Sequence, residues 1–194
     1  MCQKLLGDAR FFRLLLLYDE DLAAIARAGG CLVCGGPVHR ARYPRKPRGG
    51  PSDLGAAYDR RESFCCAKDG CRKRLTPPSL RFLGRKVYLG AVVVLISAMM
   101  HGASAKRLKR LRATIGASRY TIERWRAWWR TTFAESAWWK GMRGRFSPPV
   151  ATSALPNALL ARFVGDAEER LVALLRFLAP LTTTAASPLA EGRR

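Results

Sequence analysis

The sequence predicts a mainly α-helical fold with a small β ribbon, and three observations lead to this prediction. Apolar residues recur at three- and four-residue spacing in several segments, cysteines form two close pairs, and basic residues gather in the middle of the chain. We expect an N-terminal helix in residues 1–30, a ribbon with a basic insert in 31–85, a three-helix unit in 86–145, and a linker, a C-terminal helix and a disordered tail in 146–194.

The first element that we expect is an amphipathic helix over residues 10–28. Its apolar residues fall on one face at the period of an α-helix. Gly29 and Gly30 follow directly and are typical of a helix C-terminus. The predicted apolar face comprises Phe11, Leu14, Leu15, Tyr18, Leu22, Ile25 and Ala26.

Two close cysteine pairs follow this helix. Cys31 and Cys34 are separated by two residues, and Cys66 and Cys71 by four. Two short loops that each present two thiolates can complete the tetrahedral coordination of one zinc ion. The pattern therefore predicts a zinc ribbon that holds one structural zinc ion.

Two details of this predicted site have alternatives. Cys65 competes with Cys66, because adjacent residues of a strand point to opposite faces and only one of them should reach the metal. We favour Cys66, whose loop to Cys71 is shorter. His39 is an alternative fourth ligand if one of the two loops opens.

The segment between the pairs is rich in arginine, proline and glycine. Pro44, Pro47 and Pro51, together with nearby glycines, predict an irregular basic insert. We expect short strands at 62–65 and 80–83, on either side of the second cysteine pair.

Three helices are predicted after the ribbon. Residues 86–101 form an apolar helix, 104–113 a short basic helix and 119–135 a longer helix. Ser104 and Ser118 are suitable N-caps for the last two. A short turn containing glycine joins these two helices, which is the arrangement of a helix-turn-helix motif.

The longer helix begins with residues suited to recognising DNA. In a helix-turn-helix motif these N-terminal residues meet base edges, where arginine pairs with guanine and glutamate accepts from cytosine. Cations of the preceding helix suit phosphates. The alternative is a basic hairpin that packs for stability, with solvated charges. The candidate base contacts are Arg119, Tyr120, Glu123, Arg124 and Arg126; the candidate phosphate contacts are Lys106, Arg107, Lys109 and Arg110; and further DNA-binding candidates are Arg45, Lys46, Arg48, Arg72, Lys73 and Arg74.

The charge of the chain favours a polyanionic partner. There are 35 lysines and arginines against 14 acidic residues, and residues 38–86 and 104–145 each carry a net charge of +10 while both ends are nearly balanced. The longest apolar run, residues 87–100, is shorter than the roughly 20 residues that span a bilayer. With no secretory signal evident, we expect a cytoplasmic, nucleoid-associated protein that binds no membrane.

A final amphipathic helix is predicted over residues 155–180, and its apolar face is a candidate dimerisation surface. Within the preceding helix, Trp125 and Trp129 are expected in the core. The remaining tryptophans, Trp128, Trp138 and Trp139, could instead stack on unpaired bases.

These motifs give residues 64–130 a resemblance to the N-terminal region of bacterial insertion-sequence transposases that carry a zinc ribbon before a helix-turn-helix. Such a region implies binding to transposon ends. This chain has no spaced set of aspartates and glutamates that could hold the two metal ions of a transposase catalytic domain. The matching pieces are the Cys31–Cys34 motif, Phe64 to Arg74, Tyr88 to Met100 and Ser104 to Trp129.

The function that we expect is sequence-selective binding of double-stranded DNA without catalysis. The resemblance implies an accessory, regulatory or remnant protein of a mobile element, acting as a homodimer or beside a separate transposase or recombinase. Neither a Ser-His-Asp set nor a glycine-rich phosphate loop is evident, so no small-molecule substrate is expected. The alternatives are an RNA-binding zinc-ribbon protein and a non-catalytic assembly module.

Overall fold

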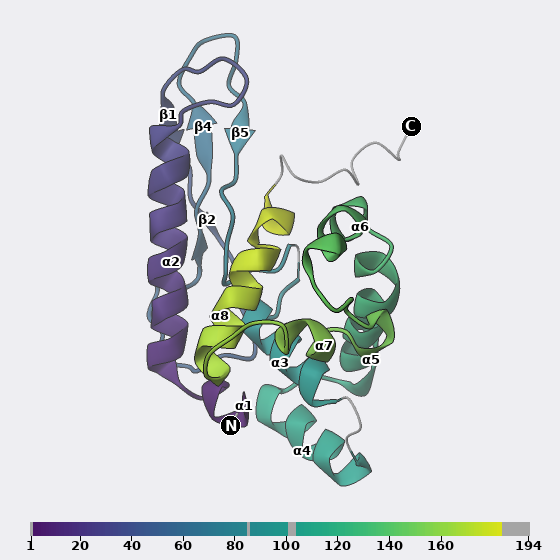
Figure 1. Ribbon diagram of the computed structural model, residues 1–194. Helices are drawn as coiled ribbons and strands as arrows, with labels where there is room; N and C mark the ends of the chain where they lie inside the picture. Colours follow the sequence, from purple (N-terminus) through teal and green to yellow (C-terminus); the bar gives the residue numbers. More distant parts are fainter. Residues whose placement is uncertain (1, 85, 101–103, 184–194) are drawn as a thin grey trace.

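The computed structural model describes residues 2–84, 86–100 and 104–183 (Figure 1). About half of the chain is helical, and a small antiparallel sheet accompanies the helices, in agreement with the predicted class. The sheet lies beside the long helix α2, and the remaining helices gather around α3 on the other side of the molecule (Figure 1).

Helix α2 (Ala9–Ala28) matches the predicted N-terminal helix and follows the short helix α1 (Cys2–Leu5). The Asp8 side chain caps α2 by accepting from the Arg10 backbone N–H. Most of the expected apolar face is covered, but Ile25 is 69% exposed. In this part of α2, Ala23 and Ala26 pack in the apolar cluster at the sheet, and Ile25 lies to one side of them.

The sheet contains β1 (Val38–Arg40), β4 (Phe64–Cys66) and β5 (Arg74–Leu75), in the order β1-β4-β5. The strand predicted at 80–83 is absent, and β5 takes its place. The insert also differs from the prediction, because β2 (Tyr43–Pro44) pairs with β3 (Arg60–Arg61) in a second, two-stranded sheet.

A buried ion pair explains why residues 80–83 do not form a strand. Asp19 of α2 and Arg81 are both 1% exposed, and Asp19 Oδ2 lies 2.8 Å from Arg81 Nε. Asp19 also accepts hydrogen bonds from the Ser79 hydroxyl and the Leu80 N–H. The segment is therefore held against α2 by a satisfied buried carboxylate.

Helix α3 (Gly90–Met99) lies at the centre of the main core, and almost every side chain in it is buried. Residues 86–89, predicted as its first turn, are extended instead, because Tyr88 forms an isolated bridge with Arg48. No helix in the part of the chain that the structure describes is long and apolar enough to cross a membrane.

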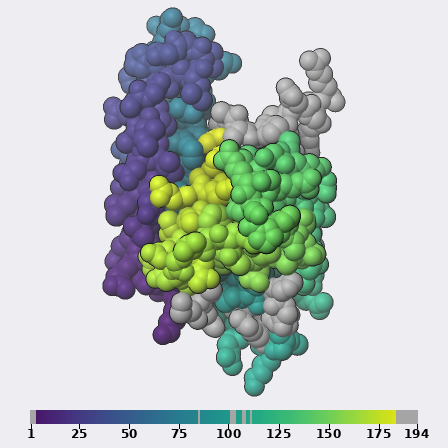
Figure 2. Space-filling view, in the orientation of Figure 1, coloured from purple at the N-terminus to yellow at the C-terminus, as the bar shows by residue number. Residues whose placement is uncertain are grey.

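The helix predicted over 155–180 is two helices, α7 (Asn157–Leu160) and α8 (Ala167–Leu178). The chain between them turns at Gly165, and a capping box of Asp166 and Glu169 starts α8. The leucines of α8 are buried in the same core as α3, so they do not form a free dimerisation face. Helix α8, in yellow, lies between α2 and the residues around α5 (Figure 2), and the predicted disordered tail lies, from residue 184 on, outside the described residues.

The remaining helices are α4 (Ala105–Ile115), α5 (Arg119–Trp128) and α6 (Ala137–Met142). The predicted helix over 119–135 continues beyond α5 only as a π-helical turn at Trp129–Phe133. Short 3-10 turns at Arg143–Arg145, Thr152–Ala154 and Ala179–Thr182 complete the described elements.

Candidate metal centre and basic helical surface

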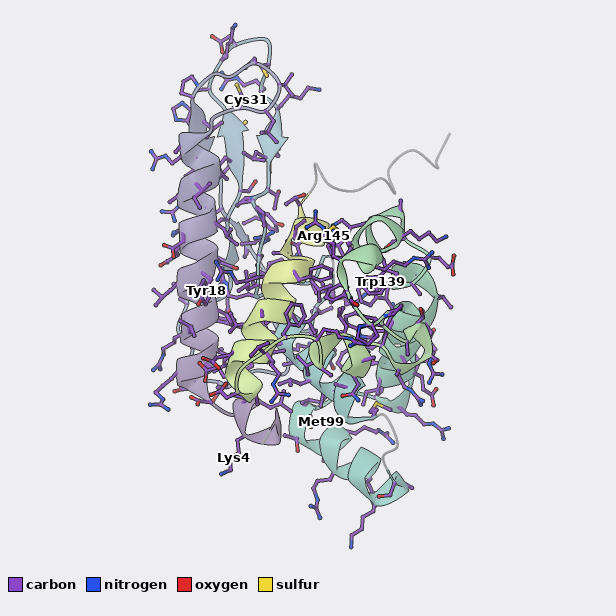
Figure 3. All side chains as sticks on the ribbon, viewed as in Figure 1. Lys4, Tyr18, Cys31, Met99, Trp139 and Arg145 are labelled. Carbon is purple, nitrogen blue, oxygen red and sulfur yellow. The ribbon has the colours of Figure 1, made fainter. Side chains whose placement is uncertain are left out.

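The four cysteines predicted as ligands lie together at the end of the molecule where α2 stops (Figure 3). The Sγ atoms of Cys31 and Cys71 are 3.7 Å apart, those of Cys34 and Cys66 are 3.5 Å apart, and all four lie within 4.8 Å of one another. A tetrahedral zinc site with sulfur ligands has sulfur atoms about 3.8 Å apart. These cysteines are free thiols rather than disulfides, so the cluster could hold a metal ion.

Local backbone geometry aims these thiols inward. The Cys31 N–H donates to the Gly36 carbonyl and the Gly35 N–H to the Cys31 carbonyl, which closes the first loop tightly. A Cβ atom on Gly36 would lie 3.4 Å from Cys34 Sγ, in van der Waals contact, so the backbone of this loop passes directly beside the sulfur atoms. In the second loop, the Lys68 N–H donates to Cys66 Sγ.

The two alternatives to this ligand set lie outside the cluster. Strand β4 buries Cys66 and turns Cys65 to the opposite face, where its thiol donates to the Arg72 carbonyl over 3.5 Å. His39 is exposed on β1, opposite Cys65 in the sheet register. The cluster is complete without either side chain.

The thiols do not ionise equally. Backbone N–H groups of Val33 and Cys34 lower the pKa of Cys31 to about 6. For Cys66, the Lys68 N–H acts in the same direction, but burial and the neighbouring cysteines outweigh it and raise the pKa to about 12. Four thiolates in one cluster repel one another, so ionisation of all four cysteines requires a bound cation.

Little apolar packing supports this end of the protein. Its buried cluster contains Ala23, Cys31, Val38, Phe64 and Cys66, and two of these five are ligand candidates. The main core lies elsewhere and is far larger. A metal ion would therefore contribute a large share of the local stability.

The second predicted site, on α4 and α5, has an apolar side and a charged side. Ile115, Ile122, Trp125 and Trp129 are buried in the main core. Ser118 caps α5, as predicted, because its Oγ accepts from the Thr121 N–H. The side chains of Arg107, Leu108 and Leu111 lie outside the described residues.

The charged side carries the predicted DNA-binding residues. Arg119, Tyr120, Glu123 and Arg124 of α5 are exposed and Arg126 is half-buried. Arg119 Nε and Glu123 Oε1 form an ion pair at 2.6 Å. Because both side chains are exposed, this pair contributes little to stability and a ligand can separate it. The exposed cations of α4 among the described side chains are Lys106, Lys109, Arg110 and Arg112.

The arginines of the insert are not equivalent. Arg40 and Arg42 both bind the buried carboxylate of Glu62, at 2.7 and 2.6 Å. Arg45 donates to the backbone carbonyls of residues 84 and 86. Among the described residues, no carboxylate pairs with Lys46 or Arg48.

The candidate metal centre and the helices α4 and α5 are not adjacent. The cysteines lie at the C-terminal end of α2, whereas α4 projects at the end where α2 begins (Figure 1). Helix α2 has 20 residues, and at 1.5 Å per residue it is about 30 Å long. Arg72, Lys73 and Arg74 are exposed beside the cysteines and therefore lie far from α4.

Tryptophans considered for base stacking are packed within the protein. Trp139 is 1% exposed, and Trp138 lies 4.7 Å from the ring of Phe177. Trp128 contacts Trp129, and the ammonium group of Lys86 lies 4.5 Å above its ring. These rings form part of the core and its border.

Comparisons of the chain with protein-family models, with curated proteins and with solved structures each find no match.

Proposed function

We propose that this protein is a zinc-dependent, sequence-selective binder of double-stranded DNA. The observation that carries the proposal is the division of α4 and α5 into two sides. Ile115, Ile122 and Trp125 are buried in the core and Trp128 is half-buried, whereas Tyr120 and the described arginines and lysines, apart from the half-buried Arg126, are exposed. A capped helix with arginines at its exposed start is suited to reading base edges in a major groove.

Zinc is the metal that best fits the cysteine cluster. Four thiolates favour a soft or borderline ion that accepts tetrahedral geometry, and the sulfur spacing suits zinc–sulfur bonds. In this proposal Cys31, Cys34, Cys66 and Cys71 hold one ion, which braces the sheet and the end of α2. The ion has a structural role.

Duplex DNA is favoured over single-stranded RNA by the placement of the aromatic rings. Recognition of unpaired bases uses exposed aromatic side chains as stacking platforms. Here Trp128, Trp138 and Trp139 pack against other aromatic rings, and Tyr120 is the large aromatic residue that the described surface exposes most. A role as an accessory or remnant protein of a mobile element, acting beside a separate recombinase, accords with this assignment.

Binding-site selection from a random duplex pool tests the proposal. Selection at about physiological salt, with and without a zinc chelator, separates sequence reading from the attraction due to net charge alone. We expect an enriched motif that is lost when zinc is removed. Retention of duplexes without enrichment, or preference for an RNA competitor, would contradict the proposal.

A further inference from the structure

We propose that the basic insert and α5 form one continuous surface for the DNA backbone, with Lys86 binding a phosphate at the junction between them. This inference rests on the proposed function and adds a second contact region to it. The junction brings together residues that are about forty positions apart in the sequence. The occupant is the sugar–phosphate backbone of the same duplex that α5 contacts.

The insert is attached to the extended segment 86–89 by backbone hydrogen bonds. The Arg48 N–H donates to the Val87 carbonyl at 3.0 Å, and the Leu89 N–H donates to the Arg48 carbonyl at 3.2 Å. Arg45 Nη2 also donates to the Lys86 carbonyl at 2.8 Å. The backbone that carries the cations of the insert is thus held beside Lys86.

A glycine makes this attachment possible. Gly49 has a φ of +88°, and a Cβ atom there would lie 2.9 Å from a methyl group of Val92 and 3.2 Å from the Tyr88 ring. A side chain at this position would be strained in its backbone and would collide with the start of α3. The insert therefore packs closely against segment 86–89 because residue 49 is glycine.

The same segment is attached to α4 and α5 on its other side. The Tyr88 hydroxyl donates to the carbonyl of Gly116 in the turn between the two helices, at 3.3 Å. The Tyr88 and Trp125 rings form a T-shaped contact at 4.9 Å. Lys86 reaches the border of α5, where its ammonium group lies 4.5 Å from the centre of the Trp128 ring. Insert, segment and helix therefore form one connected unit.

Four of the cations along this unit lack carboxylate counter-ions among the described residues. No carboxylate in the described ranges pairs with Lys46, Arg48, Lys86 or Arg124. Burial, together with repulsion from Arg124, lowers the pKa of Lys86, so its ammonium group has lost part of its hydration and faces the Trp128 ring without a carboxylate beside it. An anion at this point would relieve both costs.

An extended row of such cations suits a polyanion better than a single small anion. Phosphates recur regularly along a DNA strand, and a row of unpaired lysines and arginines can neutralise several of them. Contacts of this kind set the position and orientation of a protein on the duplex without reading its sequence. The insert would thus fix how α5 enters the groove.

The salt dependence of duplex binding by the full-length, zinc-loaded protein tests the role of Lys86. The variant Lys86→Met keeps the apolar stem against Trp128 and removes the charge. Lys140→Met is the matched control, because Lys140 is already paired with Glu135 at 2.7 Å. Loss of one phosphate contact should reduce the slope of log affinity against log salt by about 0.9. We expect this reduction for Lys86→Met, little change for Lys140→Met, and a slope near that of the wild type for Lys86→Arg.

A footprint tests the insert independently of Lys86. Hydroxyl-radical footprinting on a bound duplex should show one protected flank that disappears in the exposed double variant Lys46→Gln/Arg48→Gln. Equal slopes for the Lys86→Met and Lys140→Met proteins, together with an unchanged footprint in the double variant, would overturn this inference. If Lys109→Ala still weakens binding in that case, the proposed function would stand. Failure of the wild-type protein to bind any duplex would overturn the proposed function itself.

Discussion

Replacing Cys66 with serine should unfold the cysteine end of the protein while leaving the main core intact. Cys66 is fully buried within the cluster, and its neighbour Cys65 lies on the opposite face of β4. The variants Cys66→Ser and Cys65→Ser thus make the same chemical change at adjacent positions. Only the first removes a proposed zinc ligand.

The size of the effect follows from the small apolar cluster at this end. Val38 and Phe64 are its two large apolar residues outside the ligand candidates, and their burial stabilises the fold by about 3–6 kcal/mol in total. Binding of a structural zinc ion stabilises small zinc domains by about 10–16 kcal/mol at pH 7. The metal is the larger contribution, because the lowest value for zinc exceeds the highest value for the apolar cluster by about 4 kcal/mol. Loss of the metal should lower the local free energy of unfolding by at least this amount, which shifts the opening equilibrium about a thousandfold.

Amide hydrogen exchange with the zinc-loaded proteins measures this local effect. In Cys66→Ser we expect residues 31–40 and 64–75 to lose protection by about three orders of magnitude, while amides of α3 and α8 keep theirs. Cys65→Ser should exchange like the wild type and retain one zinc per chain. Wild-type protection of the cysteine end in Cys66→Ser, or equal zinc loss from both variants, would refute the reasoning.

Three further predictions concern the core and the basic surface. Asp19→Ala leaves Arg81 buried and unpaired, so the free energy of unfolding should fall by about 3–5 kcal/mol in denaturant titrations; Asp21→Ala, on an exposed position of the same helix, should stay close to the wild type. Arg124→Ala should change the selected sequence, whereas Lys109→Ala should weaken selected and scrambled duplexes equally; parallel titrations at one salt concentration compare them, and identical effects would argue against base reading by α5. Burial and Arg124 lower the pKa of Lys86, and a bound phosphate favours its charged form, so duplex affinity should fall as the pH rises through this lowered pKa. The affinity of Lys86→Arg should lack that fall, and parallel pH profiles for the two proteins would contradict the role of Lys86.

Features that depend on local sequence were predictable. The face of α2 follows from apolar spacing, and the start of α5 follows from Ser118, whose side chain needs only the next few residues to form its cap. The grouping of the four cysteines could also be predicted, because short loops limit how far apart the members of each pair can lie.

Features that depend on distant partners were not predictable. Pro44 suggested irregular structure, but as an edge residue it can pair with Arg60 in β2 and β3. Leu80 to Leu83 have the composition of a strand, but the buried carboxylate of Asp19, about sixty residues earlier, binds the segment instead. The distance between the cysteines and α4 follows from how α2 crosses the molecule, which no short motif reports.

The central position of α3 constrains the order in which the protein can be completed during synthesis. The chain emerges from its N-terminus, and the nearly all-apolar α3 appears about seventy residues before the leucines of α8 that cover it. A Cβ atom on Gly90 would lie only 3.4 Å from a methyl group of Leu175, which shows how closely the late segment approaches the early one. Until α8 is released from the ribosome, the apolar side of α3 that α8 covers stays exposed, and such transiently exposed surface favours aggregation. A nascent chain that stops after Arg145 would therefore be prone to aggregate, even though it already contains every cysteine of the cluster and both helices of the basic surface.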